Sequence, residues 1–119
     1  MNKNVIDKSI KRSQLGEVSN FFNTKFLNYK NKSFNFEVTF PKKSLNPFQT
    51  VQGGMIASAL DEATAISVSI FTEDKKLPNS SDLHISFHRP VKMGKANVSA
   101  KIIKIGKRMV SIEGKLYNP

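Results

Sequence analysis

The chain has 119 residues, which is the length of one domain and enough to bury a single hydrophobic core. Nineteen Lys and Arg against nine Asp and Glu give a formal charge of +10, so anionic partners are favoured: nucleic acid, an anionic membrane surface or a small ligand with phosphates. There is no cysteine, which excludes disulfides, thiolate metal sites and thiol nucleophiles.

The distribution of charged and apolar residues also bears on the location of the protein and on its class of partner. The N-terminal residues are basic without the apolar centre of a signal peptide, and Asp61 and Glu62 interrupt the longest apolar run before it reaches the roughly 18 residues that cross a bilayer. We therefore expect a cytoplasmic protein without a membrane span. The cations are mostly Lys scattered among Asn and Ser, with no RNA-recognition or helix-turn-helix signature, so specific nucleic-acid binding is disfavoured.

The first part of the chain predicts one helix and one strand. Apolar residues spaced by three and four within residues 10–27 predict a short amphipathic helix after a frayed basic tail. Residues 34–40 (FNFEVTF) alternate apolar and polar side chains and end at Pro41, as a half-buried antiparallel strand does. We expect residues 1–33 to form the tail and helix, and residues 34–119 to form the folded domain.

The remainder predicts a long helix and three strands. Apolar residues of the segment 55–71 fall on every side of a helical wheel, which indicates a helix enclosed by other elements. Strands are predicted at residues 82–89, 96–105 and 108–117, bounded by proline or glycine. This order predicts an α+β fold, in which an antiparallel sheet wraps around one long central helix.

Two glycines begin the central helix, within residues 52–62 (QGGMIASALDE). Backbone N–H groups at a helix start have no intrahelical acceptor and lie at the positive end of the helix dipole, and Gly53 and Gly54 would let a ligand approach them closely. The pair is therefore a candidate oxyanion hole. Alternatively, the glycines only permit a tight turn into the helix.

Two carboxylates lie within this apolar helix, where they must be paired, hydrogen-bonded or protonated. From the residues alone, either Asp61 or Glu62 could act in catalysis. Asp61 follows Gly53 by eight residues, a rise of about 12 Å along an α-helix. An oxyanion donor and a nucleophile or base must each lie about 3 Å from the reacting group. If both residues are catalytic, two subunits must pair with their helices antiparallel.

The two histidines, His84 and His88, are four residues apart in a predicted strand and so on the same face. No third metal ligand and no Ser-His-Asp triad can be identified with them. We interpret them as strand residues, and we expect neither a metal nor another cofactor.

The central segment resembles that of the hotdog-fold acyl-CoA thioesterases, specifically their phenylacetyl-CoA thioesterase-like branch. The family pattern is Asn, several residues, His-Gly-Gly and then Asp within the central helix. The matches here are Asn46, Gly53, Gly54 and Asp61, with Gln52 at the histidine position.

Two downstream segments are also similar to the family. Residues 80–94 (SSDLHISFHRPVKMG) resemble its strand that begins with Thr or Ser and ends in Arg-Pro ahead of a glycine, and residues 106–108 (GKR) resemble its next turn. Family members usually add another strand after a short turn, so we expect that the last family strand is lacking from residues 34–119.

The resemblance implies a role for each matching residue. Asp61 would attack the thioester carbonyl or activate water, and the N–H of Gly53 from the opposing subunit would polarise the carbonyl oxygen. Asn46 would orient the water or the carboxylate, and Ser80 would hold the water or Asp61 from the far side. Gln52 can hydrogen-bond a neighbouring group but, unlike the family histidine, cannot hold a proton near neutral pH.

The resemblance also gives the positive charge a specific interpretation. Gly54 and cations near the mouth of the cleft would bind the substrate, because coenzyme A carries a 3′-phosphate and a pyrophosphate. The candidate cations are Arg89, Lys92, Lys107 and Arg108, together with Lys95 and Lys104. We expect an acyl-CoA thioesterase that forms a homodimer or a dimer of dimers with active sites at the subunit interface. The alternative is a non-catalytic acyl-CoA-binding module of the same fold.

Overall fold

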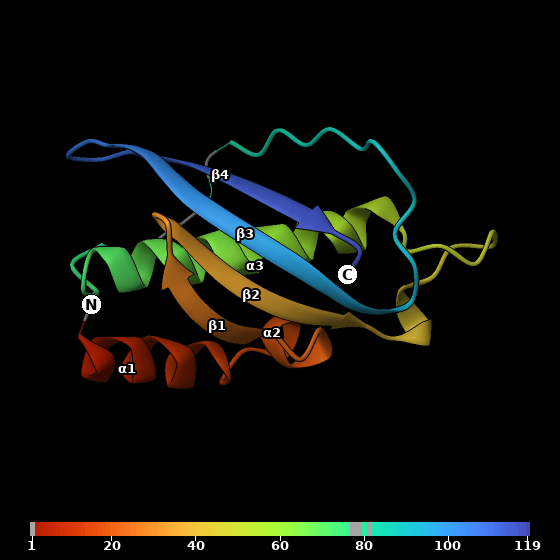
Figure 1. Ribbon diagram of the computed structural model, residues 1–119, viewed down its shortest axis with the longest axis horizontal. Helices are drawn as coiled ribbons and strands as arrows, with labels where there is room; N and C mark the ends of the chain where they lie inside the picture. The colour runs from red at the N-terminus through yellow and green to blue at the C-terminus, as the bar shows by residue number, and fades with distance from the viewer. Residues whose placement is uncertain (1, 77–79, 81) are drawn as a thin grey trace.

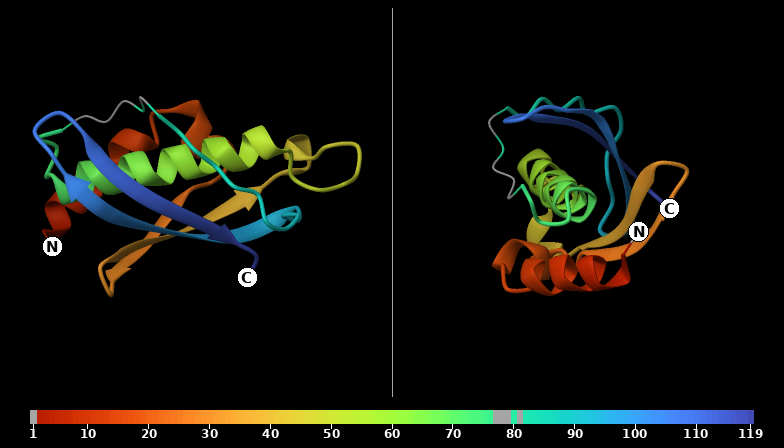
Figure 2. Two further views of the ribbon diagram at one scale, coloured as in Figure 1. Left: turned by 90° about the horizontal axis from the view of Figure 1, so that it is seen from above. Right: turned by 90° about the vertical axis from the view of Figure 1, so that its left-hand side faces the viewer.

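The computed structural model describes residues 2–76, 80 and 82–119. Its strands form one antiparallel sheet in the order β1-β2-β3-β4, and the sheet curls around the long helix α3 (Figures 1 and 2). The short helices α1 and α2 pack against α3 beside the sheet. The α+β architecture with a central helix is therefore as the sequence predicts. The elements are α1 (Lys3–Ser13), α2 (Glu17–Phe21), β1 (Lys25–Lys30), β2 (Ser33–Phe40), the 3-10 turn η1 (Lys42–Ser44), α3 (Gly53–Phe71), β3 (Gly94–Ile105) and β4 (Val110–Tyr117).

The core lies between the inner face of the sheet and α3. β2 alternates strictly between buried and half-buried residues, and β3 places small side chains inward at Ala96, Val98 and Ala100. α3 is long and apolar enough to cross a membrane by length and composition alone, but here it is the core helix of the domain. On β4, Gly114 allows close approach, since a Cβ there would lie 3.1 Å from methyl groups of both Leu60 and Thr64.

The N-terminal region differs from the prediction in two ways. The expected frayed tail is the ordered helix α1, capped by the Asn2 side chain at the N–H of Asn4 (2.8 Å). The helix expected to reach residue 27 ends at α2, and residues 25–30 form β1 instead. Asn23 adopts a positive φ of 46°, which ends the helical path and redirects the chain into the β1–β2 hairpin.

The segment 82–90 is not a strand, although its sequence predicts one. A strand needs a ladder partner, and β4 pairs with β3 alone within the described sheet. The chain after this segment is fixed by other bonds: Val51 donates its N–H to the carbonyl of Val91 (2.8 Å), and the Asn118 amide contacts the backbone of Pro90 and Lys92 (3.4 and 3.5 Å). Figure 1 shows this segment crossing the molecule from α3 back to β3.

Candidate active site

The start of α3 is capped by the residue that replaces the family histidine. Gln52 lies at the N-cap, and its side-chain oxygen accepts a hydrogen bond from the N–H of Met55 (3.1 Å). Within the described part of the chain, the N–H groups of Gly53 and Gly54 donate to no acceptor. A Cβ on Gly54 would lie 2.9 Å from the Gln52 oxygen, so a glycine there leaves room for the cap. The helix start therefore presents two free donors at its positive end.

An aromatic ring lies over the first of these glycines. A Cβ built on Gly53 would be 3.3 Å from the tip of the Phe87 ring, which comes from the segment 82–90. Phe87 is itself more than half exposed. The sequence does not single out this residue, because its alternation there is typical of an ordinary strand. The ring therefore packs against the first residue of α3, next to its free N–H groups.

Asp61 is half-buried on α3, and one oxygen of its carboxylate accepts a hydrogen bond from the hydroxyl of Ser80. The two residues are 19 positions apart, so only the folded chain brings them together. The bond leaves the second carboxylate oxygen of Asp61 with lone pairs for a water or a substrate. The contact joins two of the residues that the family resemblance selects.

The adjacent carboxylate has a different environment. Burial raises the pKa of Glu62, and the negative charge of Asp61 raises it further. Folding therefore favours the protonated form of Glu62. Neighbouring carboxylates with unlike environments are suited to different roles. Of the two, Asp61 is the one that accepts the hydrogen bond from Ser80.

Asn46 organises its own loop, and among the described residues it makes no hydrogen bond to Asp61. Its side-chain oxygen accepts from the N–H groups of Phe48 (2.9 Å) and Thr50 (3.2 Å), and its amide donates to the Thr50 hydroxyl (2.9 Å). The loop 46–50 is thereby fixed just before α3. Within one subunit, Asn46 acts on the path into the helix rather than on the carboxylate.

The structure confirms that Gly53 and Asp61 share one helix, α3. They are therefore about 12 Å apart along its axis, at 1.5 Å per residue. One α3 cannot present both groups to one thioester carbonyl, which is only a few ångströms across. The exposed or half-buried surface of α3 between them carries the small residues Gly54, Ala57 and Ser58, which would allow a second helix to approach closely.

The four candidate phosphate ligands fall into two separate groups. Arg89 and Lys92 are exposed near the N-terminal end of α3, on the chain that leads into β3. Lys107 and Arg108 lie in the turn after β3, and the Lys107 carbonyl accepts a hydrogen bond from Lys76 beyond the C-terminus of α3 (2.5 Å). Because β3 has 12 residues, the two groups are about 35 Å apart at 3.3 Å per residue. One subunit cannot bring all four cations to one pyrophosphate.

The histidines do not occupy a strand. His84 and His88 are both exposed in the segment 82–90. Among the described residues there is no group of three or more His, Asp or Glu side chains that could hold a metal ion.

Comparison with known proteins decides the family. The family model of the thioesterase superfamily matches residues 48–119, which include α3, the Asp61 carboxylate and Ser80. The chain belongs to the thioesterase superfamily. No curated protein matches it.

Solved structures share its hotdog fold. A phenylacetic acid degradation-related protein from Ralstonia eutropha JMP134 superposes with a TM-score of 0.79 at 26% identity, covering 92% of this chain and 89% of the other. The PaaI protein of the phenylacetic acid degradation operon of E. coli gives 0.74 at 18% identity (93% and 82%). Thioesterase superfamily member 2 from Mus musculus gives 0.77 at 19% identity (98% and 84%). The predicted superfamily and hotdog fold are thus confirmed, the similar structures include two phenylacetic acid degradation proteins, and thioester hydrolysis is supported as the general activity.

Proposed function

We propose that this protein hydrolyses an acyl-CoA thioester to a free acid and coenzyme A in a site shared between two subunits. The observation that carries the proposal is the hydrogen bond between Ser80 and Asp61, on a helix whose first turn presents the free N–H of Gly53. These two groups suit the hydrolysis of a thioester, with an oxyanion donor at the carbonyl oxygen and a carboxylate as nucleophile or base near the carbonyl carbon. Their separation along α3 favours a donor from one subunit and a carboxylate from the other.

In the proposed reaction, the Gly53 N–H of one subunit donates to the thioester oxygen and stabilises the charge that develops there. Asp61 of the other subunit attacks the carbonyl carbon or removes a proton from the attacking water. The C–S bond then breaks, and the thiolate of coenzyme A leaves and takes a proton from the protonated Asp61 or from water. Where Asp61 has attacked directly, a water then hydrolyses the acyl–Asp61 anhydride, which releases the free acid and restores the carboxylate. Ser80 holds the carboxylate in place, and Asn46 and Gln52 fix the loop and cap that aim the Gly53 N–H.

Substrate binding would use the surface around the helix start. Gly54 leaves the backbone open to the ligand, and Arg89 and Lys92 are exposed nearby and suited to the phosphates of coenzyme A. Lys107 and Arg108 are proposed as phosphate ligands at the opposite end of β3, where they would serve a substrate bound by another subunit. Exposed lysines bind phosphate diffusely, so this contribution should weaken as salt is added.

The activity is tested by measuring thiol release from a panel of acyl-CoAs with the wild type, Asp61→Ala and Glu62→Gln. We expect turnover by the wild type and by Glu62→Gln, and none by Asp61→Ala although it still binds acyl-CoA. Equal rates for the wild type and Asp61→Ala would remove Asp61 from the mechanism. Wild-type binding without hydrolysis of any thioester would favour the alternative, a non-catalytic acyl-CoA-binding module.

The shared site is tested separately by mixing two inactive variants. Gly53→Pro removes the N–H donor at a helix position that proline tolerates, and Asp61→Ala removes the carboxylate. Only in a mixed dimer does one site combine an intact Gly53 with an intact Asp61. Unfolding and refolding the two together should restore about a quarter of wild-type turnover, since half of the dimers are mixed and each has one working site. A site within one subunit would recover nothing.

A further inference from the structure

The end of the molecule opposite the α3 N-terminus combines exposed apolar side chains with lysines. Three segments meet there: the β1–β2 turn, the residues after α3, and the β3–β4 hairpin (Figure 1). We call this surface the basic apolar end, and it consists of Tyr29, Lys32, Phe71, Lys75, Lys76 and residues 101–105. Four of its large apolar side chains are exposed by between 37% and 59%, which is unusual for a surface facing only water: Tyr29, Phe71, Ile103 and Ile105.

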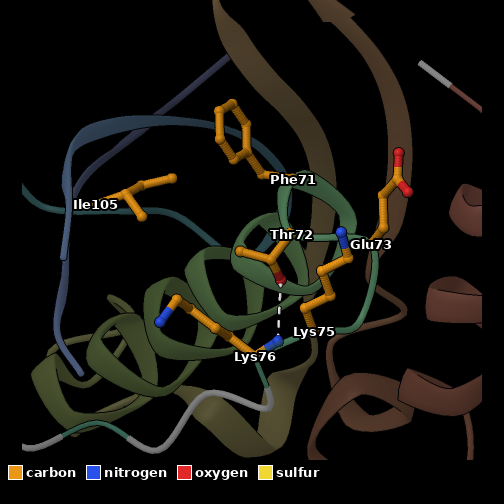
Figure 3. Close-up of a pocket in the computed structure, with 6 residues that line it drawn as sticks. All are labelled: Phe71, Thr72, Glu73, Lys75, Lys76 and Ile105. Carbon is orange, nitrogen blue, oxygen red and sulfur yellow. Dashed lines mark hydrogen bonds between the residues drawn. The ribbon is translucent and has the colours of Figure 1, made fainter. Parts of the chain in front are cut away.

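A β-bulge sets the direction of the apolar residues in the hairpin. Ile102 pairs with Ile112 and Lys104 pairs with Ser111, so Ile103 is an extra residue in β3. The bulge reverses the alternation beyond it, which brings Ile105 onto the same depression as Phe71. Figure 3 shows both side chains among the residues that line this depression, with Ile105 on the hairpin and Phe71 at the end of α3. Ile103 remains 59% exposed.

Two adjoining shallow depressions share Phe71 and Ile105, with volumes of about 370 and 360 Å³. Lysines surround both of them. The first depression also has Glu73, whereas the neighbouring Asp74 is neutralised by Arg12 (2.6 Å). The surface is therefore strongly positive around an apolar centre. The lining lysines are Lys32, Lys75, Lys76, Lys101 and Lys104.

We propose that the basic apolar end docks on an anionic lipid bilayer. The charge selects the occupant, because a second copy of this surface would bring like charges together, whereas a layer of anionic headgroups is complementary to it. Apolar side chains at the tip of a hairpin can enter the interface between headgroups and acyl chains while the flanking lysines remain at the headgroups. The hairpin lies at one end of a molecule 42 Å long, so its tip can reach a flat surface. This binding does not depend on hydrolysis.

The test is co-sedimentation of the full chain with phosphatidylcholine vesicles that contain or lack phosphatidylserine. The wild type should bind only the anionic vesicles. Lys101→Gln/Lys104→Gln and Ile103→Ser should each weaken that binding by about tenfold. The matched controls are Lys42→Gln/Lys43→Gln, which removes two exposed charges from η1 at the other end, and Leu15→Ser, which removes an exposed apolar side chain between α1 and α2. Both controls should bind as the wild type does.

Three outcomes would overturn the proposal. The first is no binding to anionic vesicles by a folded wild type, checked by thermal unfolding. The second is an equal loss in the Lys101/Lys104 and Lys42/Lys43 variants, which would indicate diffuse attraction by the net charge. The third is a dimer that Ile103→Ser converts to monomer, together with unchanged vesicle binding, which would make this surface a contact between copies.

Discussion

Ser80 donates a hydrogen bond to the carboxylate of Asp61 across 19 positions of sequence. The bond selects one of two neighbouring carboxylates and fixes its orientation. A hydrogen bond to an ionised group contributes about 1.5–3 kcal/mol, which is enough to hold a side chain in a single rotamer. Where Asp61 acts as nucleophile or base, this orientation decides the rate.

Ser80→Ala should lower kcat for acyl-CoA hydrolysis by about ten- to a hundredfold, corresponding to the loss of one hydrogen bond to a charged group. KM should change little, because in the proposed mechanism the hydroxyl orients Asp61 rather than binding the substrate. Steady-state thiol release measures both constants. Ser80→Thr retains a hydroxyl and is the matched control, which should keep most of the activity. A fall in Ser80→Ala that appears only in KM would contradict a role in orienting Asp61.

Gln52→Ala should lower the free energy of unfolding by about 0.5–1 kcal/mol, because it removes the side-chain acceptor for the N–H of Met55 at the start of α3. Urea unfolding measures the change. Gln52→Ser places a preferred N-cap residue at the same position and should restore the stability. If Gln52→Ala and Gln52→Ser are equally stable, the capping bond contributes nothing.

Gly114→Ala should destabilise the protein by about 1–3 kcal/mol through overpacking, since the new Cβ would lie 3.1 Å from methyl groups of Leu60 and Thr64. Thermal unfolding should show a lower Tm. Adding Thr64→Ser removes one of those methyl groups but keeps the hydroxyl that bonds to the carbonyls of Leu60 and Asp61. The double variant should therefore recover part of the loss. A Tm unchanged in Gly114→Ala would show that α3 and β4 separate without cost.

The central helix and the last two strands could be predicted because each has a local signal. α3 carries an apolar pattern over 19 residues. β3 begins at Gly94 and ends just before Gly106, and β4 follows the turn that contains Gly106. β1 was missed because Phe26 fits the helical spacing of Phe22, and only the positive φ at Asn23 separates the two elements. The segment 82–90 was predicted as a strand because its alternation is local, whereas a ladder partner is a tertiary property.

The features of the candidate site also divide into those that the sequence predicts and those that it does not. The family resemblance selected Ser80 and Asp61 separately, and the fold brings them together. The position of Phe87 over Gly53 could not be read from sequence, since a loop rather than a strand delivers the ring. The spacing of Gly53 and Asp61 was predictable because α-helix geometry depends on residue number alone. The separation of Lys92 from Lys107 follows from the length of β3, most of which the predicted strand at 96–105 covers.

Glu62→Gln should raise the free energy of unfolding at neutral pH by less than about 1 kcal/mol, because the half-buried site favours the uncharged form. The native pKa is raised, so the charged carboxylate costs stability as the pH rises from the unfolded-state value through the native one. The advantage of the variant should therefore vanish at pH values below the ordinary Glu pKa. Urea unfolding across this range measures it, with Glu113→Gln on the exposed face of β4 as control. If Glu62→Gln is less stable than the wild type at neutral pH, folding does not favour the uncharged form of Glu62.

Asp74→Asn should show the opposite pH dependence. A hydrogen bond from Arg12 lowers the pKa of Asp74, and its charge and a bond from Ser9 act in the same direction. Folding therefore favours the carboxylate, and its contribution is present above the ordinary Asp pKa and is lost as the pH falls through the lowered native value. Asn is the suitable replacement because residue 74 has a φ of 62°, which Asn tolerates.

The wild type should exceed Asp74→Asn by about 0.5–1 kcal/mol near neutral pH, a value limited by the 39% exposure of the Arg12 side chain. Urea unfolding at a series of pH values should show this difference shrinking in acid. Arg12→Gln should cost a similar amount, and the double variant should cost no more than either single one, because all three break the same link between α1 and the end of α3. Additive losses in the double variant would mean that Arg12 and Asp74 stabilise the fold through different partners.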